Sequence, residues 1–386
     1  MRTVLIASVA SMHDQFNREN IKILQEIGYE VDLIANFQVG NTSSQARVQA
    51  FMKEMQAQNV RCYDVPIPRK ISAIKDMWNS YRTIKRIQEE RQYDLAHMHS
   101  PIGGVLGRLA MKKARKNGTR VIYTAHGFHF YRGASLLNWL VFMPIEKFLS
   151  RYMDILVTIC KEDYINAAKF GIGKHICLIP GIGIDVEKIK HLKTNRDFKA
   201  ELGISEDSIM ILSIGELNRN KNHETVLRAI ASLPQKELHY VICGQGDQKQ
   251  HLEQLAKELG LEGRLHLLGF REEAKEWLTQ ADIFAFPSFR EGLPVSLMEA
   301  MAVGLPVVAS RVRGNVDLIK EEKGGFLLQP NDVEGFAHGL QLLCVNRKLC
   351  KKMGAYNQKA IEAFDKSNTN RVMKRIYQGG NGKQEG

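Results

Sequence analysis

The feature that most constrains the fold of this chain is a repeated change in the period of its hydrophobic pattern. Short apolar runs, which are typical of buried strands, alternate with longer segments in which apolar residues recur at helical spacing. Helical segments such as Arg18–Ile27 and Trp78–Glu90 separate several of these runs. In the first part of the chain the apolar runs are Thr3–Ser8, Glu30–Ala35, Leu95–His99, Arg120–Ala125, Ile155–Ile159 and Ile176–Ile179. Strands that alternate with helices predict a parallel sheet with helices on both faces.

The same alternation begins again near residue 210. The expected strands are Met210–Ile214, Leu238–Cys243, Leu265–Leu268, Ile283–Phe286 and Pro306–Ala309. The expected helices are His223–Leu233, Lys249–Leu259, Glu272–Gln280 and Pro294–Ala302. Two such series predict an α/β chain with two doubly wound, Rossmann-like domains, at 1–190 and 191–365. A C-terminal helix and a frayed tail follow at 366–386, and the helix is expected to pack back on the first domain. Ligands of open α/β sheets bind beyond the carboxyl ends of the strands, so we expect the site in a cleft between the domains.

Length and composition are consistent with this organisation. A chain of 386 residues suits two domains, and 44% hydrophobic with 25% charged residues excludes a disordered chain or a coiled coil. The six cysteines form no C-x-x-C pair, which favours reduced thiols in a cytoplasmic protein. No apolar stretch is long enough to span a bilayer, and Met1–Ser8 is expected to be a strand rather than a signal peptide.

The charge of the chain is strongly positive and unevenly distributed. The formal net charge is +12, and residues 61–120 alone hold 14 Lys and Arg against 5 Asp and Glu. Such an excess of basic residues favours the binding of an anionic partner. The alternative is that these residues form a solvated face of a helix. The basic run Lys112–Lys116 and the apolar segment Leu136–Phe148 together suggest a patch for an anionic membrane surface. Trp139 and Phe142 of that segment would belong either to the patch or to the core. Peripheral attachment to the inner face of the cell membrane is therefore a hypothesis.

The segment from Phe286 to Ser310 carries the most chemical information. A strand leads into a loop with Glu291, and a helix is expected to begin near Pro294, since proline favours the first helical turn. The free N–H groups of such a turn form an anion site that suits a phosphate. Glu291 and Glu299 would lie on either side of that phosphate and accept hydrogen bonds from vicinal hydroxyl groups. The alternative is that both glutamates are exposed surface charges.

The pattern E-G-L-P-x-x-L-x-E-A-M-A-x-G-x-P-V-V-A-S over Glu291–Ser310 resembles the retaining glycosyltransferases of family 4, which have the GT-B fold. The resemblance extends over most of the chain. It also covers Tyr123–Phe128, Ser213–His223, Cys243–Asp247 and Leu268–Arg271. Any one of these segments alone is weakly specific, whereas together they are highly specific.

The resemblance implies roles for the matching residues. Glu299 would bind the ribose hydroxyls, and Glu291 would contact the donor sugar. Lys221 would neutralise the diphosphate as it leaves. The backbone that would hold the diphosphate belongs to Leu293, Pro294, Val295 and Ser296. The resemblance implies a nucleotide-sugar donor, UDP-linked by expectation, and no required cofactor.

One position departs from the family pattern. The family usually has Gly-Arg-Leu where this chain has Gly215-Glu216-Leu217, so the usual phosphate-binding arginine is a glutamate. Either Arg219 supplies the guanidinium group to the phosphate or Lys221 acts alone. Gly215 remains part of the expected donor-binding loop. Phe270 and Arg271 lie where the family has its base-binding loop.

A histidine of the first domain completes the predicted site. His126 follows an expected strand at its carboxyl end, and the resemblance implies that it faces the donor sugar, as a catalytic or positioning residue. His97 and His99 have the spacing of a metal pair, but no carboxylate or cysteine completes a ligand set, so no metal site is predicted. Gly103, Gly104 and Gly107 match a dinucleotide-binding loop only loosely.

The sequence thus predicts a retaining, metal-independent hexosyltransferase. It would move a hexose or N-acetylhexosamine from the nucleotide sugar to a glycan or polyprenyl-diphosphate-linked acceptor in cell-surface polysaccharide synthesis. The alternatives are a polyanion- or nucleic-acid-binding protein and a nucleotide-sugar epimerase, phosphorylase or sensor of the same fold. The chain has no recognised nucleic-acid-binding motif, so nucleic acid is not an expected partner.

Overall fold

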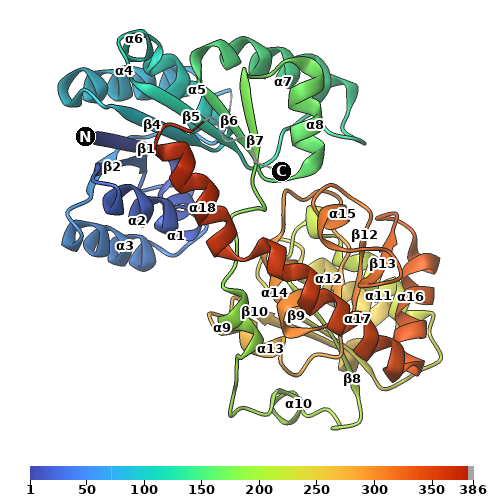
Figure 1. Ribbon diagram of the computed structural model, residues 1–386. Helices are drawn as coiled ribbons and strands as arrows, with labels where there is room; N and C mark the ends of the chain where they lie inside the picture. The colour runs from blue at the N-terminus through green and yellow to red at the C-terminus, as the bar shows by residue number, and fades with distance from the viewer. Residues whose placement is uncertain (71, 381–386) are drawn as a thin grey trace. The chain divides into compact units, whose positions relative to one another are not determined.

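The computed structural model describes residues 1–70 and 72–380 and divides the chain into two compact units (Figure 1). Unit 1 comprises Met1–Ile182 and the chain from Ser367 on, and unit 2 comprises Gly183–Lys366. Each unit contains a parallel sheet with helices on both of its faces (Figure 1), which confirms the predicted fold class. The tail predicted to fray lies largely outside the described residues, which end at residue 380.

The described part of unit 1 is built on a seven-stranded sheet in the order β3-β2-β1-β4-β5-β6-β7. Its strands are β1 (Arg2–Val9), β2 (Glu30–Asn36), β3 (Arg61–Asp64), β4 (Leu95–His99), β5 (Arg120–Ala125), β6 (Ile155–Thr158) and β7 (His175–Leu178). Its helices are α1 (Ala10–Phe16), α2 (Arg18–Glu26), α3 (Gln45–Ala57), α4 (Ile74–Arg91), α5 (Pro101–Ala110), α6 (Lys112–Lys116), α7 (Leu136–Leu149), η1 (Ser150–Tyr152) and α8 (Lys161–Phe170). The central strands are buried on both faces, which explains why they are continuous apolar runs rather than alternating ones.

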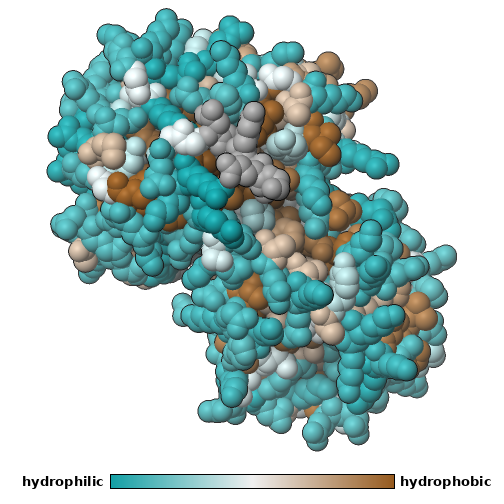
Figure 2. All heavy atoms as spheres, viewed as in Figure 1, coloured by the Kyte–Doolittle hydropathy of each residue, from teal (hydrophilic) through white to brown (hydrophobic). Residues whose placement is uncertain are grey.

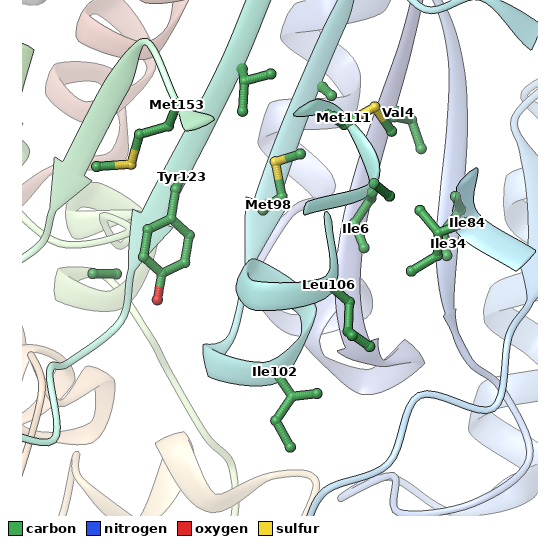
Figure 3. Close-up of a cluster of buried hydrophobic side chains, with 14 of the residues drawn as sticks. Val4, Ile6, Ile34, Ile84, Met98, Ile102, Leu106, Met111, Tyr123 and Met153 are labelled. Carbon is green, nitrogen blue, oxygen red and sulfur yellow. The ribbon is translucent and has the colours of Figure 1, made fainter. Parts of the chain in front are cut away.

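Helix α5 lies unusually close to this sheet. A Cβ atom on Gly104 would come within 2.5 Å of Tyr123, and one on Gly107 within 2.6 Å of Met98. Ile102 and Leu106 of the same helix project into the apolar cluster that Figure 3 shows. The loose dinucleotide-loop pattern is therefore explained by close helix-to-sheet packing.

Helix α18 (Lys366–Tyr377) brings the C-terminal part of the chain back to unit 1. Figure 1 draws it in red beside the blue N-terminal elements, and Asn370 donates to Glu19 of α2 at 3.0 Å. The hydroxyl of Tyr377 contacts Nδ1 of His97 at 2.8 Å, and the Arg120 guanidinium donates to the carbonyl of Ile376. These buried polar contacts attach the helix to strands β4 and β5.

The described part of unit 2 is built on a six-stranded sheet in the order β10-β9-β8-β11-β12-β13. Its strands are β8 (Ile209–Ile214), β9 (Leu238–Cys243), β10 (Leu265–Gly269), β11 (Ile283–Phe286), β12 (Val307–Ser310) and β13 (Gly325–Leu328). Its helices are α9 (Val186–Lys190), α10 (Phe198–Glu201), η2 (Arg219–Lys221), α11 (His223–Ala231), α12 (Lys249–Glu258), η3 (Glu262–Arg264), α13 (Ala274–Trp277), α14 (Val295–Val303), α15 (Asn315–Leu318), α16 (Val333–Val345), α17 (Arg347–Ala360) and η4 (Ile361–Phe364). The order of the strands reverses between β8 and β11, and such a switch point is where open α/β sheets bind ligands.

The structure contains two strands, β3 and β13, that the sequence analysis did not predict. β3 carries Arg61 and Asp64 at its ends and lies at the edge of its sheet, where charged residues are tolerated. β13 begins at Gly325 and is also an edge strand. Both are short and only partly buried, and neither forms a continuous buried apolar run.

Helix α7 is mainly apolar and contains three strongly polar residues, Asn138, Glu146 and Lys147. Trp139 and Phe142 pack against the core of unit 1, so these two aromatic side chains do not make an outward patch. The outward face instead exposes Leu136, Leu137, Leu140, Val141, Ile145 and Phe148, between 39% and 81% each. Among the described residues, no helix has both the length and the apolar character needed to cross a membrane.

Candidate active site

The predicted donor-binding residues of unit 2 gather where β8 and β11 end. These two strands are hydrogen-bonded neighbours, so the segments that follow them leave the sheet at the same edge. The segment after β8 carries Lys221, and the one after β11 carries Glu291. The Lys221 Nζ atom lies 2.7 Å from Oε1 of Glu291 and 4.8 Å from the centre of the Phe286 ring. Both charged side chains are largely buried, with 19% and 11% of their surfaces exposed.

The loop between β8 and η2 is held by close backbone contacts. A Cβ atom on Gly244 would lie 1.8 Å from the carbonyl oxygen of Gly215, so only glycine fits there. The buried ring of His223 contacts the carbonyl oxygen of Glu216 at 3.3 Å and the hydroxyl of Tyr240 at 2.9 Å. Burial lowers the pKa of His223 to about 4, so the ring is neutral near pH 7. The loop shape is thus fixed by Gly215, Gly244 and His223, which lie in the segments that resemble the family, and by Tyr240, which sequence reasoning did not single out.

A second loop, from the end of β11 to α14, presents Glu291. The side chain of Asn220 donates to the carbonyl oxygen of Arg290 at 3.0 Å, which ties this loop to η2. The Arg313 guanidinium donates to the carbonyl oxygen of Glu291 at 3.0 Å. Gly314 has φ +81°, and a Cβ atom there would lie 1.8 Å from the carbonyl oxygen of Gly292. Arg313 and Gly314 therefore fix the position of the backbone at Glu291 and Gly292.

Helix α14 begins directly after this loop. Pro294 is its N-cap residue and makes no side-chain hydrogen bond to the first turn, to which Val295 and Ser296 belong. The chain thus presents a helix N-terminus next to the Lys221 and Glu291 pair. Such a terminus favours an anion.

Glu299 occupies the same helix and is 5% exposed. Its Oε1 atom lies 2.7 Å from Nζ of Lys275, whose side chain is 54% exposed. Burial raises the pKa of Glu299, while the ammonium group of Lys275 opposes that rise. Lys275 was not predicted, because a single lysine on a short charged segment gives no sequence signal. A buried carboxylate held by an exposed lysine can exchange that partner for hydroxyl groups of a ligand.

The remaining predicted donor-site residues differ in exposure. Phe270, which follows β10, is 67% exposed, and Arg271 beside it contacts Glu273 at 3.8 Å. Arg219 is exposed and lines a hollow of about 510 Å³ whose described lining includes neither Lys221 nor Glu291. Glu216 accepts a hydrogen bond from the Asn218 side chain at 2.7 Å. Leu293 and Pro294 are buried beneath the loop.

The histidines of unit 1 form a cluster at the carboxyl ends of β4 and β5. Nε2 of His126 lies 3.1 Å from Nδ1 of His99, and the ring of Phe16 stands 5.8 Å from that of His126. His97 contacts the hydroxyl of Thr124 at 2.7 Å in addition to Tyr377. In the residues that the structure describes, no three His, Cys, Asp or Glu side chains are grouped so as to hold a metal ion.

Two family models match the chain. Residues 17–188 match the model described as Glycosyltransferase Family 4, and residues 194–360 match the model described as Glycosyl transferases group 1. A Bacillus subtilis (strain 168) protein named as the glycosyltransferase EpsD is 33% identical over 382 residues, which cover 97% of this chain and 96% of the relative.

A second relative and a solved structure agree with these matches. The Escherichia coli UDP-Gal:alpha-D-GlcNAc-diphosphoundecaprenol alpha-1,3-galactosyltransferase is 31% identical over 330 residues, covering 80% of this chain and 82% of the relative. Anabaena HepE in complex with UDP-glucose superimposes with a TM-score of 0.76 at 19% identity, covering 98% of this chain and 99% of that one. This likeness shows the GT-B fold. On these family matches, the chain is a sugar-transferring enzyme that belongs to glycosyltransferase family 4.

Proposed function

We propose that this enzyme transfers a hexose or N-acetylhexosamine from a UDP-sugar to a polyprenyl-diphosphate-linked or glycan acceptor, with retention of anomeric configuration and without a divalent metal. The observation that carries the proposal is the position of Lys221 and Glu291 beside the N-terminus of α14, with the buried Glu299 on the same helix. A cation, a helix dipole and two carboxylates are what a sugar diphosphate requires.

Each part of the donor has a proposed partner. The diphosphate binds the backbone of Leu293–Ser296 and the ammonium group of Lys221. The ribose hydroxyls replace Lys275 as the partners of Glu299, and the base lies against Phe270 and Arg271. Phosphate binding draws Lys221 away from Glu291, which frees that carboxylate for hydroxyl groups of the sugar.

The proposed reaction breaks the bond between the anomeric carbon and the oxygen of the β-phosphate. The acceptor hydroxyl attacks on the face that the diphosphate leaves, and its proton passes to the departing phosphate oxygen. Negative charge therefore grows on the diphosphate. Preorganised donors aimed at such a charge are worth a few kcal/mol each, and Lys221 with the α14 N–H groups supplies them here. His126 of unit 1 is proposed to bond a hydroxyl group of the sugar, while Arg219 and Gly215 stay assigned to the diphosphate loop.

Turnover of UDP-[¹⁴C]sugars and calorimetric titration with UDP test the donor site. Lys221→Ala is expected to lower kcat about 100-fold and to weaken UDP binding less than tenfold, because its charge acts mainly on the leaving group. Glu299→Ala is expected to weaken UDP binding at least tenfold. Lys257→Ala on the exposed face of α12 serves as the control. Wild-type kcat and affinity in both site variants would refute the assignment, and EDTA should leave the rate unchanged.

The acceptor class is supported by a relative. The Escherichia coli enzyme is named for transfer to a diphosphoundecaprenol-linked sugar, which is a lipid embedded in a membrane. An enzyme that uses such a substrate must reach the bilayer surface. The outward leucines of α7 offer an apolar face for that purpose, and an exposed apolar patch of this kind marks a surface for interaction. The face of the molecule in Figure 2 is mostly hydrophilic.

Basic residues border this apolar face. The Arg151 guanidinium lies 4.6 Å from the centre of the Phe148 ring at the end of α7. The Lys112 ammonium lies 5.1 Å from the Tyr152 ring, and Arg115 donates to the carbonyl oxygen of Arg151 at 3.3 Å. The basic helix α6 is thus next to the end of α7. An apolar face with a cationic border suits an anionic bilayer, which is the occupant we propose.

Sedimentation with phosphatidylglycerol-containing vesicles tests the membrane surface. Leu137→Glu combined with Leu140→Glu is expected to weaken vesicle binding at least tenfold, because two apolar side chains would no longer enter the bilayer. Val345→Glu is the control, since Val345 and Leu137 are both 68% exposed. Binding should also fall as salt rises. If the wild type does not bind these vesicles at low salt, the proposed membrane-binding surface is refuted.

A further inference from the structure

The polar contact in unit 1 that most directly concerns the proposed reaction joins the buried His99 to the partly buried His126. β4 and β5 are parallel neighbours, with His99 paired to Thr124 in the register. His126, two residues further along, therefore emerges at the same edge of the sheet as His99. Nδ1 of His99 and Nε2 of His126 are 3.1 Å apart, within hydrogen-bond distance.

A hydrogen bond between two imidazole nitrogens needs one proton between them. Burial lowers the pKa of His126 to about 4 and that of His99 well below its ordinary value, and the neighbouring His97 and His13 lower the pKa of His99 further. Both rings are therefore neutral near pH 7. Each neutral ring carries one N–H group and one acceptor nitrogen, so two arrangements are open: either His99 or His126 donates.

The other nitrogen of His99 decides between these arrangements. Nε2 of His99 is buried without a hydrogen-bond partner in the described structure, and the whole residue is 1% exposed. If the proton were on Nε2, a buried N–H group would be left unbonded, and orphaned buried donors are rarer than orphaned acceptors. The proton of His99 is therefore on Nδ1, and His99 donates to Nε2 of His126. The neutral His126 ring must then carry its own proton on Nδ1.

We infer that His99 is a positioning residue that fixes the orientation of His126 and holds it as the Nδ1–H tautomer. His126 thereby offers an N–H donor, rather than an acceptor, to an oxygen atom of the donor sugar or its diphosphate. The inference rests on the proposed role of His126 in sugar transfer. No residue besides His99 is bonded to Nε2 of His126 in the described structure, so the tautomer depends on this one contact.

Nitrogen NMR of the full-length protein, labelled with ¹⁵N-histidine and free of donor, tests the tautomer without any activity measurement. Correlation spectra distinguish the protonated from the unprotonated ring nitrogen, and the His126→Gln variant assigns the His126 signals. The expected result is protonated Nδ1 and unprotonated Nε2 in His126. A protonated Nε2 of His126 in the wild type would overturn the inference.

Variants of His99 test the positioning role. His99→Phe keeps a ring but removes the donor, and it should convert His126 to a mixture of tautomers and lower kcat/KM about tenfold. His99→Asn places an amide N–H near the position of Nδ1 and should restore the tautomer and most of the activity. His97→Asn, a change in the same cluster with no bond to His126, should leave the His126 tautomer as in the wild type.

The outcomes separate the inference from the proposed function. An unchanged His126 tautomer in His99→Phe overturns the inference, as does a His99→Asn variant that behaves like His99→Phe. Full activity of His126→Gln would instead refute the proposed role of His126 in transfer, while the NMR result would still decide which tautomer His99 imposes.

Discussion

At the scale of single residues, both carboxylates of the donor site are neutralised by lysines. Glu291 contacts Lys221 and Glu299 contacts Lys275, each at 2.7 Å. Removing one partner from a largely buried pair leaves an unpaired charge, which is costly. A ligand that binds one residue of such an ion pair must therefore also provide a binding partner for the other residue. A sugar diphosphate does this, because its phosphates attract Lys221 and its hydroxyl groups satisfy the glutamates.

Glu299→Gln is expected to separate binding from stability. Burial raises the pKa of Glu299, so the fold favours its protonated form and its contribution to stability declines as pH rises through that pKa. The neutral amide avoids this cost, so the variant should melt no lower than the wild type at pH 7.5. It should bind UDP at least tenfold more weakly, because an amide oxygen is a poorer partner for two hydroxyls. Calorimetry and thermal unfolding measure both effects.

Glu253→Gln provides the matched control for this prediction. Glu253 is exposed on α12 and contacts Lys249 at 3.6 Å, so its neutralisation should change neither UDP affinity nor, beyond about 0.5 kcal/mol, stability. Unchanged UDP affinity in Glu299→Gln would be incompatible with the ribose assignment.

At the scale of elements, the site depends on loops whose backbones touch. Gly314 allows the turn before α15 to lie against Gly292, and Arg313 of that turn bonds to the carbonyl oxygen of Glu291. The side chain of Asn220 fixes the same loop from η2. Loops positioned in this way by a rigid sheet are typical places for binding residues.

Gly314→Ala is expected to displace the loop that carries Glu291. The new Cβ atom would lie 1.8 Å from the backbone oxygen of Gly292, so the loop must move, and kcat/KM should fall at least tenfold. Gly260→Ala is the control, because Gly260 also has a positive φ, +67°, but has open space around its Cβ position. The control should lose about 1–2 kcal/mol of stability and keep its activity. Equal activity of the two variants would show that the contact with Gly292 does not matter.

At the scale of the whole molecule, the chain concentrates neutral buried histidines in unit 1. Burial lowers the pKa of His13 to about 4, of His97 to about 3 and of His126 to about 4, and it also lowers that of His99. In the unfolded chain each would take up a proton near pH 6.5. The unfolded state therefore binds more protons between pH 6.5 and about 4, and stability must fall as pH falls through that range.

We expect the unfolding free energy of unit 1 to decrease on acidification from pH 6.5 to pH 5. Each such histidine contributes up to about 1.4 kcal/mol per pH unit, so four give at most about 5.6 kcal/mol per pH unit. Urea unfolding of the Trp277→Phe variant measures this, because its fluorescence then comes from Trp78 and Trp139 of unit 1. The exposed His191→Ala change should not alter the slope. A flat pH dependence in this range would contradict the prediction.

Regular elements were the part of the fold most open to prediction. The expected bounds of β4, β5, β9 and β11 agree with the structure, because nearly every residue of these strands is buried and they form continuous apolar runs. Edge strands β3 and β13 were missed, since neither is buried along its whole length. The apolar character of α7 was also evident, but which of its residues face outward was not: Trp139 and Phe142 turned out to pack on the core.

The residues of the candidate site could be predicted from the sequence only where they belong to a recognisable motif. Lys221, Glu291 and Glu299 were singled out from their spacing and resemblance, and the structure brings the first two into contact. Lys275 and Arg313 were not singled out, because their partners lie 24 and 22 residues away without any regular spacing. His99 was considered only as a metal ligand, whereas in the structure it contacts His126.

The amino-acid sequence alone therefore determined the two α/β series and the residue types that stand where β8 and β11 end. Local periodicity and short motifs encode both, because each depends on neighbours a few residues apart. Tertiary structure decided the pairing of buried charges, the hydrogen-bond partner of His126 and the residues to which α18 is bonded in unit 1. The bond between His97 and Tyr377 joins residues 280 positions apart, and a contact of that kind is set by packing rather than by any local pattern.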